Sequence, residues 1–324
     1  MGRLRPGRTG GRVRPLRGRT GGREILGTTT TRRTLLTAAT TTAATLALGA
    51  GPAYAEDPRH RDTHARLREL EARHRARIGA FAYNLRTKAT VRHRAAERFP
   101  ICSVFKTLAA AAVLRDLDRH GETLARRIHY TVADLAGYSP KTGEPEHLAD
   151  GMTVEELCDA AIRYSDNTAA NLLLRELGGP TAITRFCRSL GDPKTRLDRW
   201  EPELNTAEPW RVQDTTTPGA IGGTYARLVL GDALHYRDRD RLTTWLLGNT
   251  TSGDRFRAGL PEDWTIADKT GTGDYGTSND VGIAWTPDGA PVALAVLSTK
   301  PARDAAADSP LVAATASVLA AAVG

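Results

Sequence analysis

Apolar residues recur with helical spacing through the middle of the chain, whereas short apolar runs bounded by turn residues lie towards both of its ends. Helical spacing predicts an amphipathic first helix over residues 57–77 and an Ala/Val/Leu-rich closing helix over residues 309–323. The short runs predict strands. The predicted strands cover residues 78–85, 90–94, 264–270, 281–285 and 291–299. Because strands flank a helical middle, we expect one sheet that is assembled from distant segments, with the two chain ends close together.

The middle of the chain is predicted to be helical, except for one long loop. An alanine- and leucine-rich run predicts a helix over residues 103–120, which Gly121 ends. Residues 122–198 are predicted to be mostly helical, and residues 224–247 return to helix. Between them, residues 200–218 show little periodicity and contain three prolines. A loop of this length is usually functional or disordered, so it is a candidate part of a site.

The formal net charge of +8 arises in the first 55 residues. That segment holds ten arginines and one acidic residue, Glu24, whereas the rest of the chain carries 35 basic and 36 acidic side chains. The body of the protein therefore has no bias towards polyanions, and we expect no nucleic-acid partner. With 324 residues, 40% of them hydrophobic, the chain is long enough for one large domain or two closely packed ones.

Residues 1–55 are predicted to be an export signal. Arg32 and Arg33 precede a weakly apolar Ala/Thr/Leu run, which ends at the A-x-A cleavage pattern Ala53-Tyr54-Ala55. Paired arginines before a mild apolar region favour the bacterial twin-arginine route, with cleavage after Ala55. The alternatives are a general secretory signal and a disordered basic tail. No later stretch is long and apolar enough to span a bilayer, so we expect a secreted protein without a membrane span in its mature form.

Three cysteines, Cys102, Cys158 and Cys187, are too few for a disulfide scaffold. An odd number leaves at least one thiol free in an exported protein. No spacing of Cys and His suggests zinc. Cys102 and Cys158 lie among apolar residues, and we interpret them as small buried hydrophobic residues.

Ser103 is the candidate nucleophile, because it alone among nine serines has a lysine three residues on. Ser103 and Lys106 would share one face at the start of a helix, where the helix dipole favours a developing negative charge. A neutral Lys106 could be the base that a serine hydroxyl needs, or a charged Lys106 could act electrostatically. The alternative is a helix-cap serine with a surface lysine. The apolar run at residues 107–114 favours function, since a lysine beside a buried helix is costly without a purpose.

Two further motifs are each ambiguous alone. Ser165-Asp166-Asn167 forms a polar turn between two predicted helices, which helix capping would also explain. Lys269-Thr270-Gly271 ends a predicted strand, where a lysine is normally an exposed edge charge. Neither motif indicates a function until the two are combined with Ser103.

The long loop carries a candidate base. Glu201 and Asn205 are four residues apart and could hold one water between a carboxylate and an amide, which is general-base geometry. The alternative is a solvated acidic loop. Arg199 and Asp214 flank the loop and could pair across its neck, which would hold it in place.

Taken together and in this order, the four motifs resemble those of the class A β-lactamases. The resemblance covers most of residues 57–324, and the combination is very specific. It implies that Ser103 forms an acyl-enzyme, that Lys106 and Glu201 share proton removal, and that Ser165 passes a proton to the leaving nitrogen. Glu201, with Asn205, would activate water for deacylation.

The resemblance also implies residues that bind substrate. Lys269 and Thr270 would face the substrate carboxylate, and Gly271 would keep that surface free of a side chain. The backbone N–H groups of Ser103 and Thr272 would form an oxyanion hole.

Three further residues would complete the binding site. Asn167 would bond the acylamino side chain of the substrate. Tyr138 matches an aromatic residue at the rim of the cleft, although a surface tyrosine in a loop is an equally good interpretation. Relatives often carry an arginine soon after the Lys-Thr-Gly motif, and Arg255 is the predicted substitute in this chain.

The implied fold is α/β (α+β): an antiparallel five-stranded sheet flanked by helices, plus an all-helical domain, with the site between them. Residues 56–98 and 248–324 would form the α/β domain, and residues 99–247 the helical domain. The implied activity is hydrolysis of the β-lactam amide of penicillins and cephalosporins, which gives antibiotic resistance. We expect a monomer that needs no cofactor or metal.

Two departures from the family pattern limit this prediction. Alanines stand where many relatives carry a disulfide partner for Cys158, so that bridge should be absent. Cys102 is similar to a feature of some carbapenem-hydrolysing members, but Gly273 stands where those carry a second cysteine, so a carbapenemase is not predicted. Two other functions stay open: a D-alanyl-D-alanine carboxypeptidase, which would not need Glu201, and a penicillin sensor, which would stay acylated and carry a transmembrane or signalling segment.

Overall fold

The computed structural model describes residues 58–324 of the chain. The predicted export signal at residues 1–55, with Arg32, Arg33 and the cleavage pattern that ends at Ala55, lies outside the described residues. Over residues 58–324, no helix has the length and apolar character needed to cross a membrane.

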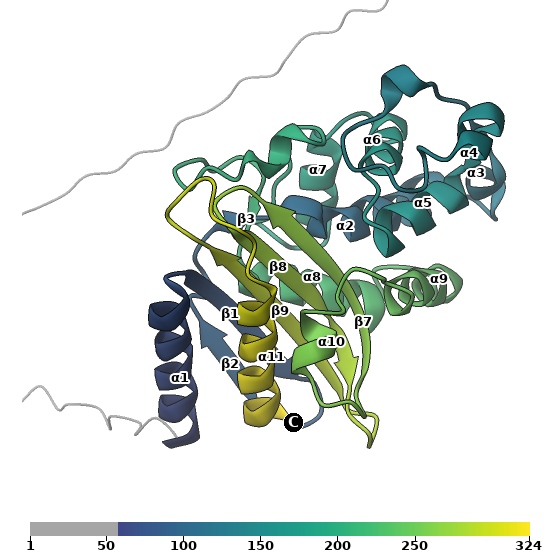
Figure 1. The fold of residues 1–324 in the computed structure, drawn as a ribbon. Helices are drawn as coiled ribbons and strands as arrows, with labels where there is room; N and C mark the ends of the chain where they lie inside the picture. The colour runs from purple at the N-terminus through teal and green to yellow at the C-terminus, as the bar shows by residue number, and fades with distance from the viewer. Residues whose placement is uncertain (1–57) are drawn as a thin grey trace, which may run out of the picture. The chain divides into compact units, whose positions relative to one another are not determined.

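A five-stranded antiparallel sheet forms the centre of the fold, with the strands in the order β2-β1-β9-β8-β7 (Figure 1). Its strands are β1 (Arg77–Asn84), β2 (Thr90–His93), β7 (Thr265–Gly273), β8 (Thr277–Trp285) and β9 (Pro291–Thr299). β1 pairs with β9 along its whole length, which confirms the predicted sheet of distant segments. β8 begins at Thr277 rather than at residue 281, because its first half pairs with the end of β7.

Two short strand pairs lie outside this sheet. β3 (Phe99–Pro100) pairs with β6 (Thr215–Thr216), and β4 (Arg127–Ile128) pairs with β5 (Met152–Thr153). Next to the first pair, Ile101 N donates a hydrogen bond to the carbonyl of Asp214 at 2.9 Å. The segment that leads to Ser103 is therefore joined to the end of the long loop.

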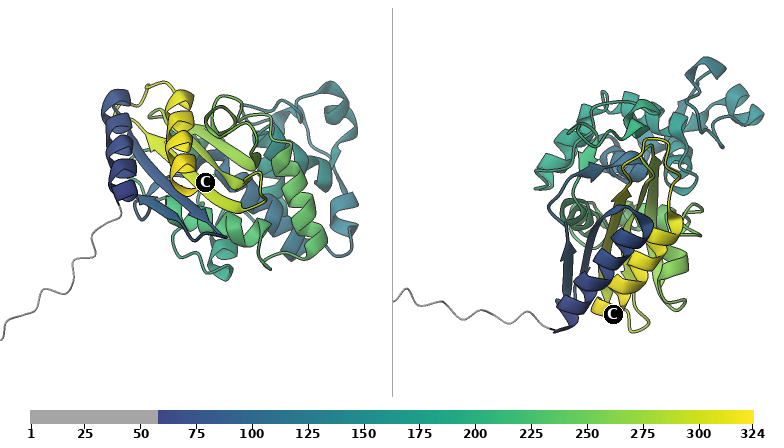
Figure 2. Two further views of the ribbon diagram at one scale, coloured as in Figure 1. Left: turned by 90° about the horizontal axis from the view of Figure 1, so that it is seen from below. Right: turned by 60° about the vertical axis from the view of Figure 1, so that its left-hand side comes forward.

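Helices cover both faces of the sheet (Figures 1 and 2). α1 (Pro58–His74), α10 (Phe256–Gly259) and α11 (Ser309–Val323) pack on one face, and α8 (Pro218–Val229) packs on the other. The alternation of β1 follows this arrangement: Ile78, Ala80 and Ala82 join the core under α1 and α11, whereas Phe81 joins the core under α8. α8 approaches closely at Gly222, where a Cβ atom would lie only 2.6 Å from the Phe81 ring.

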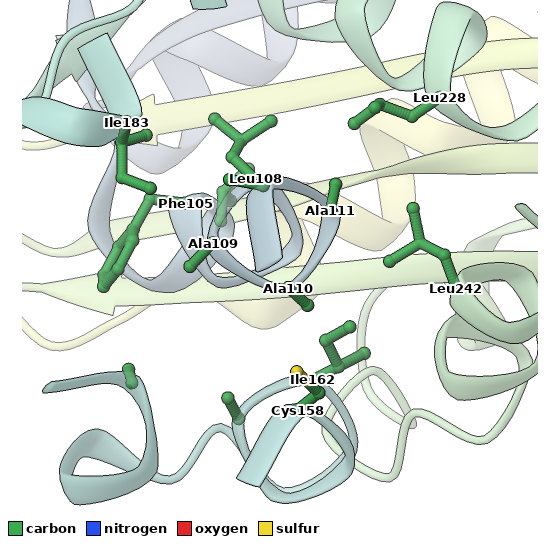
Figure 3. Close-up of a cluster of buried hydrophobic side chains, with 14 of the residues drawn as sticks. Phe105, Leu108, Ala109, Ala110, Ala111, Cys158, Ile162, Ile183, Leu228 and Leu242 are labelled. Carbon is green, nitrogen blue, oxygen red and sulfur yellow. The ribbon is translucent and has the colours of Figure 1, made fainter. Parts of the chain in front are cut away.

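Other helices pack around α2 (Phe105–Ala112), every residue of which is buried: α5 (Val154–Arg163), α6 (Asn167–Glu176), α7 (Thr181–Ser189) and α9 (Tyr236–Leu247). The remaining short elements are α3 (Glu122–Ala125), α4 (Pro145–Asp150) and the 3₁₀ turns η3 (Val132–Asp134) and η4 (Glu203–Thr206). Figure 3 shows apolar side chains of α2 among Ile162 of α5, Ile183 of α7 and Leu242 of α9. Small alanine side chains let these helices approach α2 from several sides, so its backbone is held rigidly in the core. The predicted fold class, a five-stranded antiparallel sheet with helices and an all-helical part, is confirmed.

The helix predicted over residues 103–120 differs from the structure at both ends. It begins as a 3₁₀ turn, η1 (Cys102–Val104), and ends as a π-helical turn, η2 (Val113–Leu117). It ends before Gly121, because Asp118 leaves the helix with extended backbone and its carboxylate accepts hydrogen bonds from two N–H groups at the start of α3. Asp118 therefore caps the next helix instead of continuing its own.

The single helix predicted over residues 224–247 is wrong. The structure has two helices, α8 and α9, separated by residues 230–235. α8 ends where the N–H groups of Leu230 and Gly231 both bond to the carbonyl of Ala226, so the regular hydrogen-bond ladder stops there.

Candidate active site

A cavity of about 400 Å³ is lined by residues from all the segments that carry the predicted motifs. The lining residues are Ser103, Tyr138, Ser165, Asn167, Asn205, Thr251, Arg255, Thr270, Gly271 and Thr272. All of these except Thr251 are predicted site residues. The remaining predicted residues, Lys106, Glu201 and Lys269, are hydrogen-bonded to the lining. The fold therefore brings every predicted site residue to one place.

Ser103 lies in the turn η1 at the start of α2, and its side chain is largely buried. Cys102 before it has left-handed backbone (φ 44°), so the chain turns sharply into the helix. The Ser103 hydroxyl donates to Glu201 Oε1 at 3.2 Å. The hydroxyl thus has a proton acceptor within reach, and the helix start favours the negative charge that develops when the proton leaves.

Lys106 lies one turn after Ser103, at the start of α2, and has no exposed surface. Its Nζ donates to the carbonyl of Ser165 at 2.8 Å and to Asn167 Oδ1 at 2.6 Å, and it lies 3.1 Å from Glu201 Oε1. Burial lowers the pKa of Lys106, and the nearby carboxylate of Glu201 opposes this effect. A lysine with a lowered pKa gives up its proton more easily than an exposed one, so it can act as a base.

The Ser165-Asp166-Asn167 turn is held by its central residue. The buried Asp166 carboxylate caps α6 by accepting from Ala169 N at 2.8 Å, and it accepts three more hydrogen bonds from residues 141–142. The backbone N–H after it donates to the carbonyl of Tyr138 at 2.9 Å. The turn and the loop that carries Tyr138 are therefore one connected unit at the edge of the cavity.

Lys269 lies on β7 and reaches this turn from the opposite side. Its Nζ donates to Ser165 Oγ at 3.0 Å and to the carbonyl of Thr270 at 2.9 Å. Burial, together with the charge of Lys106, lowers the pKa of Lys269 well below its usual value. Two buried amines therefore flank Ser165, one at its carbonyl and one at its hydroxyl.

β7 passes close to the backbone that precedes Ser103. A Cβ atom on Gly271 would lie 3.1 Å from the carbonyl of Ile101 and 3.2 Å from Cys102 Cβ. A side chain there would crowd the nucleophile's own segment, so glycine suits this position. The next residue but one, Gly273, is similarly confined, because a Cβ atom would lie 2.8 Å from Cys102 Sγ.

Glu201 begins the long loop and is turned inward, with 3% of its surface exposed. Its Oε1 atom faces Ser103 and Lys106, while its Oε2 atom accepts from the side-chain amide of Asn205. Its backbone is fixed by Asn171, whose Oδ1 accepts from Glu201 N at 3.0 Å and whose Nδ2 donates to Glu201 O at 2.8 Å. The peptide bond that follows Glu201 is cis.

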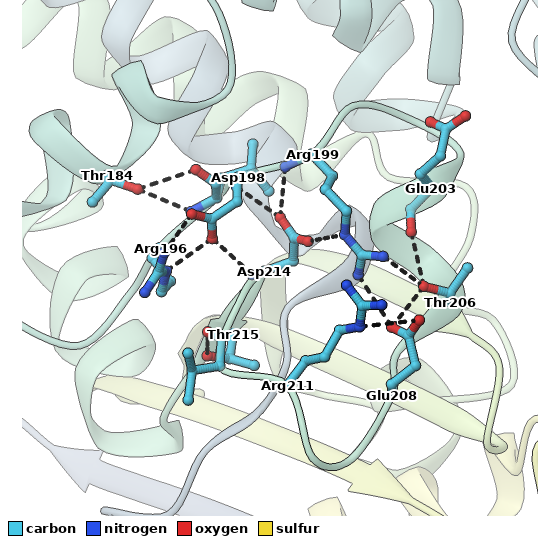
Figure 4. A network of polar contacts seen from close by, with 12 residues as sticks. Thr184, Arg196, Asp198, Arg199, Glu203, Thr206, Glu208, Arg211, Asp214 and Thr215 are labelled. Atoms are coloured by element: carbon cyan, nitrogen blue, oxygen red, sulfur yellow. Dashed lines mark hydrogen bonds and ion pairs between the residues drawn. The ribbon is translucent and has the colours of Figure 1, made fainter.

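Arg199 and Asp214 close the neck of the long loop (Figure 4). Arg199 Nε donates to Asp214 Oδ2 at 2.6 Å, which confirms the predicted pair. Asp214 Oδ1 also accepts from the backbone N–H groups of Asp198 and Arg199, at 2.7 and 3.0 Å. Arg199 then extends into the loop, where it donates to Thr206 Oγ1 at 2.8 Å and lies 3.3 Å from Glu208 Oε2. These contacts hold the loop, and with it the inward-facing carboxylate of Glu201, in a fixed position.

Arg255 lines the cavity, but its side chain is largely buried. Its guanidinium donates to the carbonyls of Gly271 and Asn279, both at 2.8 Å, and to Thr272 Oγ1 at 2.7 Å. Burial lowers its pKa, and nearby carboxylates oppose this effect. Arg255 thus contributes positive charge and orients the Thr272 hydroxyl. Tyr138, by contrast, stands at the rim with 59% of its surface exposed.

Two residues of the site were missed by the sequence analysis. Asn171 was overlooked, although a polar residue in an apolar helix four positions after Asn167 was a signal, since such residues share a helix face. Thr251, whose hydroxyl bonds that of Thr270 across the cavity wall, lies in a segment without a recognisable motif.

Cys102, Cys158 and Cys187 are free thiols, and all three are buried. Burial raises the pKa of each thiol, so each stays protonated. The interpretation of Cys102 and Cys158 as buried hydrophobic residues is confirmed. Throughout residues 58–324, His, Cys, Asp and Glu side chains form no group that could hold a metal ion.

Comparison with known proteins agrees with this site. Residues 62–322 match the model of the family described as the β-lactamase enzyme family. The β-lactamase of Streptomyces fradiae is 63% identical over 279 residues, which cover 86% of this chain and 91% of that protein. The β-lactamase of Streptomyces lavendulae is 62% identical over 283 residues, covering 87% and 93%. The solved structure of the β-lactamase from Streptomyces albus G superposes with a TM-score of 0.80 at 63% identity, covering 81% of this chain and 100% of that one.

A serine hydroxyl between a buried lysine and a buried glutamate, on this fold, defines a serine acyl-transfer enzyme. With the family match over nearly all of the described residues, the chain belongs to the β-lactamase enzyme family as a class A serine β-lactamase. It hydrolyses β-lactam antibiotics, and this activity confers resistance to them.

Proposed function

We propose that Ser103 is the nucleophile of this reaction and that Lys106 and Glu201 share the removal of its proton. Ser103 Oγ would bond to the carbonyl carbon of the β-lactam ring, and the ring C–N bond would break. The closeness of the three groups supports shared proton removal, since Glu201 Oε1 lies 3.2 Å from Ser103 Oγ and 3.1 Å from Lys106 Nζ. Lys106 would act directly, and Glu201 would act through a water molecule.

The nitrogen that leaves must take up a proton, and Ser165 would supply it. Its hydroxyl accepts a hydrogen bond from Lys269 at 3.0 Å, so the proton it gives away can be replaced from a neighbouring amine. The lowered pKa values of Lys106 and Lys269 suit such a relay, because each amine gives up its proton more easily than an exposed lysine.

Deacylation would be driven by Glu201 and Asn205. A water held between the carboxylate and the Asn205 amide would attack the ester on Ser103, and Glu201 would take its proton. Asn205 Oδ1 is buried and has no protein partner, so it is available to that water. Asn171 would keep Glu201 in position through its two backbone hydrogen bonds.

The substrate carboxylate would lie against β7. Lys269, Thr270 and Thr272 would face it, Gly271 would leave room for it, and Arg255 would add positive charge from behind Thr272. Gly271 lets the substrate approach the strand closely, and the buried cations Lys269 and Arg255 favour an anion at this wall.

Other groups around the cavity would bind the rest of the substrate. The backbone N–H groups of Ser103 and Thr272 would form the oxyanion hole. Asn167 would bond the acylamino side chain, and Tyr138 would cover it from the rim.

One observation carries these roles: Glu201 is turned inward onto Ser103 and Lys106 from the frame of the long loop. The test is nitrocefin turnover by the mature protein beside Glu201→Ala. We expect multiple turnovers for the native protein and a trapped acyl-enzyme for the variant, with deacylation slowed by about 10²–10⁴-fold. Mass spectrometry would detect the covalent adduct on Ser103.

Glu203→Ala is the matched control, because Glu203 is an exposed carboxylate two residues further along the same loop. It should turn over like the native protein. Unchanged deacylation in Glu201→Ala would remove Glu201 from the proposed role. Stoichiometric labelling of the native protein without turnover would instead indicate a sensor.

We also propose that the enzyme is exported by the twin-arginine route and acts as a monomer. The arginine pair at residues 32–33 and the A-x-A pattern at residues 53–55 support export. Normal secretion of an Arg32→Lys, Arg33→Lys variant would exclude that route. Light scattering of the mature protein would give its oligomeric state, and a mass of twice the mature chain would exclude the monomer.

A further inference from the structure

Two carboxylic acids lie side by side behind the cavity wall, and the catalytic steps above use neither of them. Asp268 of β7 and Asp280 of β8 have no exposed surface. In the antiparallel register Asp280 is opposite Thr270, and Asp268 is opposite Gly282, so the two side chains are diagonal neighbours on one face of the sheet. Gly282 makes room for this contact, because a Cβ atom there would lie 2.8 Å from Asp268 Cβ.

The surrounding donors show which of the two acids carries a negative charge. Asp268 accepts from Asn249 Nδ2 at 2.8 Å and lies 3.4 Å from the Arg257 guanidinium, so it is placed as the anion. Asp280 Oδ2 accepts only the backbone N–H of Phe256 at 3.1 Å. Asp280 Oδ1 has no hydrogen-bond donor, although the Asp268 carboxyl group is its diagonal neighbour on the sheet. A hydrogen bond between the two carboxyl groups would require one proton, and Asp280 Oδ1 is the atom left to carry it.

Burial raises the pKa of both groups, and the charge of Asp268 raises that of Asp280 further, well above its usual value. The other titratable groups that act on the pair are Arg255, Arg257 and Lys269 with positive charge, and the buried phenol of Tyr225. These cations favour one negative charge on the pair. A second negative charge would have no free donor to stabilise it, since Asp280 Oδ1 has no hydrogen-bond donor.

Two chains of hydrogen bonds lead from the pair to the cavity. The first runs from Asp268 to Asn249, whose Oδ1 accepts from the backbone and hydroxyl of Thr251, and then from Thr251 to the hydroxyl of Thr270. The second runs from Asp280 to the backbone N–H of Phe256.

The second chain ends beside a residue of the cavity wall. Phe256 follows Arg255, whose guanidinium holds the Thr272 hydroxyl. Both chains therefore end at the wall where the substrate carboxylate is proposed to bind.

We propose that Asp268 and Asp280 share one proton and that this singly charged pair is a positioning device for the carboxylate-binding wall. The pair holds the segment of residues 249–257 against β7 and β8, and so sets the places of Thr251 and Arg255. This inference rests on the proposed binding of the substrate carboxylate at that wall. Loss of the shared proton would place two negative charges in one buried site, and their repulsion would displace the segment.

The first test compares three variants at neutral pH with a penicillin that carries its carboxylate. Asp280→Ala removes the bond to Asp268, and we expect KM to rise about tenfold with kcat nearly unchanged. Asp280→Asn keeps a neutral donor in the same place, so its KM should stay near the native value. Asp263→Asn is the control, because Asp263 is an exposed carboxylate before β7, outside the pair and the segment that it holds, and it should leave KM unchanged.

The second test observes the proton itself and does not depend on activity. Infrared spectroscopy of the native protein at neutral pH should show the carbonyl band of one protonated carboxyl group, which Asp280→Asn removes. Absence of that band would overturn the inference, and so would a KM for Asp280→Asn as high as that for Asp280→Ala. If Asp280→Ala does not fold, the infrared band and the Asp280→Asn variant still decide the question.

Arg255→Ala separates this inference from the proposed substrate-binding role. A raised KM for Arg255→Ala with an unaltered KM for Asp280→Ala would overturn the positioning role alone. An unaltered KM for Arg255→Ala would contradict the proposed role of Arg255 in binding, whereas the infrared band would still decide whether the pair holds a proton.

Discussion

The ammonium group of Lys106 and the carboxylate of Glu201 lie 3.1 Å apart, and neither side chain has exposed surface. One comes from the core helix α2 and the other from a loop without regular structure on either side of a 3₁₀ turn. Their contact therefore joins the helical core to the long loop of residues 200–218. Activity and stability are therefore coupled at this pair, since each charge is compensated mainly by the other.

Removal of one partner of this pair should destabilise the fold. Lys106→Met leaves the Glu201 carboxylate buried without its cation, so the free energy of unfolding should fall by about 3–5 kcal/mol. The double variant Lys106→Met, Glu201→Gln removes both charges of this pair and should recover much of that loss. Urea unfolding of the two single variants and the double variant measures this cycle. Strictly additive losses would show that the two groups do not compensate each other.

The neck of the long loop should matter both for stability and for deacylation. Asp214 is 1% exposed and accepts three hydrogen bonds, so Asp214→Ala should lower the free energy of unfolding by about 3 kcal/mol. Deacylation should slow more than acylation, because Glu201 is held by this loop. Single-turnover kinetics separate the two steps.

The contrast for this prediction is Arg211→Ala, which breaks a pair with Glu208 in which Arg211 is well exposed. Exposed pairs contribute about 0–1 kcal/mol, so this variant should remain near the native stability. Equal losses in the free energy of unfolding for Asp214→Ala and Arg211→Ala would contradict the conclusion that the neck contributes more than an exposed ion pair.

The three cysteine thiols should be unreactive in the folded protein. Each is buried, and burial raises its pKa, so neither access nor thiolate is available. A chromogenic disulfide reagent should label none of them until denaturant is added, and should then label all three. Rapid labelling of one thiol in the native protein would contradict the buried environment of that cysteine.

The dependence of the free energy of unfolding on pH should differ between the native protein and Asp280→Asn. Asp280 keeps its proton in the folded protein above the pH at which it is lost from the unfolded chain, because its folded pKa is raised well above the usual 3.8. The folded state then binds more protons, so this contribution is fully present below the unfolded pKa and is lost as pH rises through the folded pKa. Asparagine cannot titrate, so the variant should lack a slope of up to about 1.4 kcal/mol per pH unit.

Urea unfolding at a series of pH values from mildly acidic to mildly alkaline measures this slope. The difference between native protein and variant is the informative quantity, because Lys106 and Lys269 have lowered pKa values and contribute the opposite slope in both. Parallel curves for the two proteins would contradict a raised pKa at Asp280.

Local patterns were sufficient for much of the fold and for the types of residue in the site. The closing helix matches α11 at residues 309–323, and the strand at residues 291–299 matches β9, because each has a clear periodicity and turn residues at its ends. The break between α8 and α9 was missed, since residues 230–235 remain apolar enough to continue a helical pattern. The spacing of apolar residues does not predict where a helix ends when local backbone hydrogen bonds, such as those to the carbonyl of Ala226, end it.

Contacts between distant segments were harder to foresee. The pair of Arg199 and Asp214 could be predicted because both flank one loop. The positions of Asn171 and Thr251 in the site could not be predicted, since their partners, Glu201 and Thr270, lie in other segments of the chain. No local pattern indicates which distant strand or loop a polar side chain will face.

By itself, the amino-acid sequence determined the five strands of the main sheet, the family, and which side chains supply the hydroxyl, amine and carboxylate groups. These properties depend on residue type and on spacing within one or two turns of the chain. Tertiary structure alone decided that Glu201 turns inward, that Lys106 and Lys269 have lowered pKa values, and that Asp268 meets Asp280. Burial and distance set charge states, and both arise only when remote segments pack against one another.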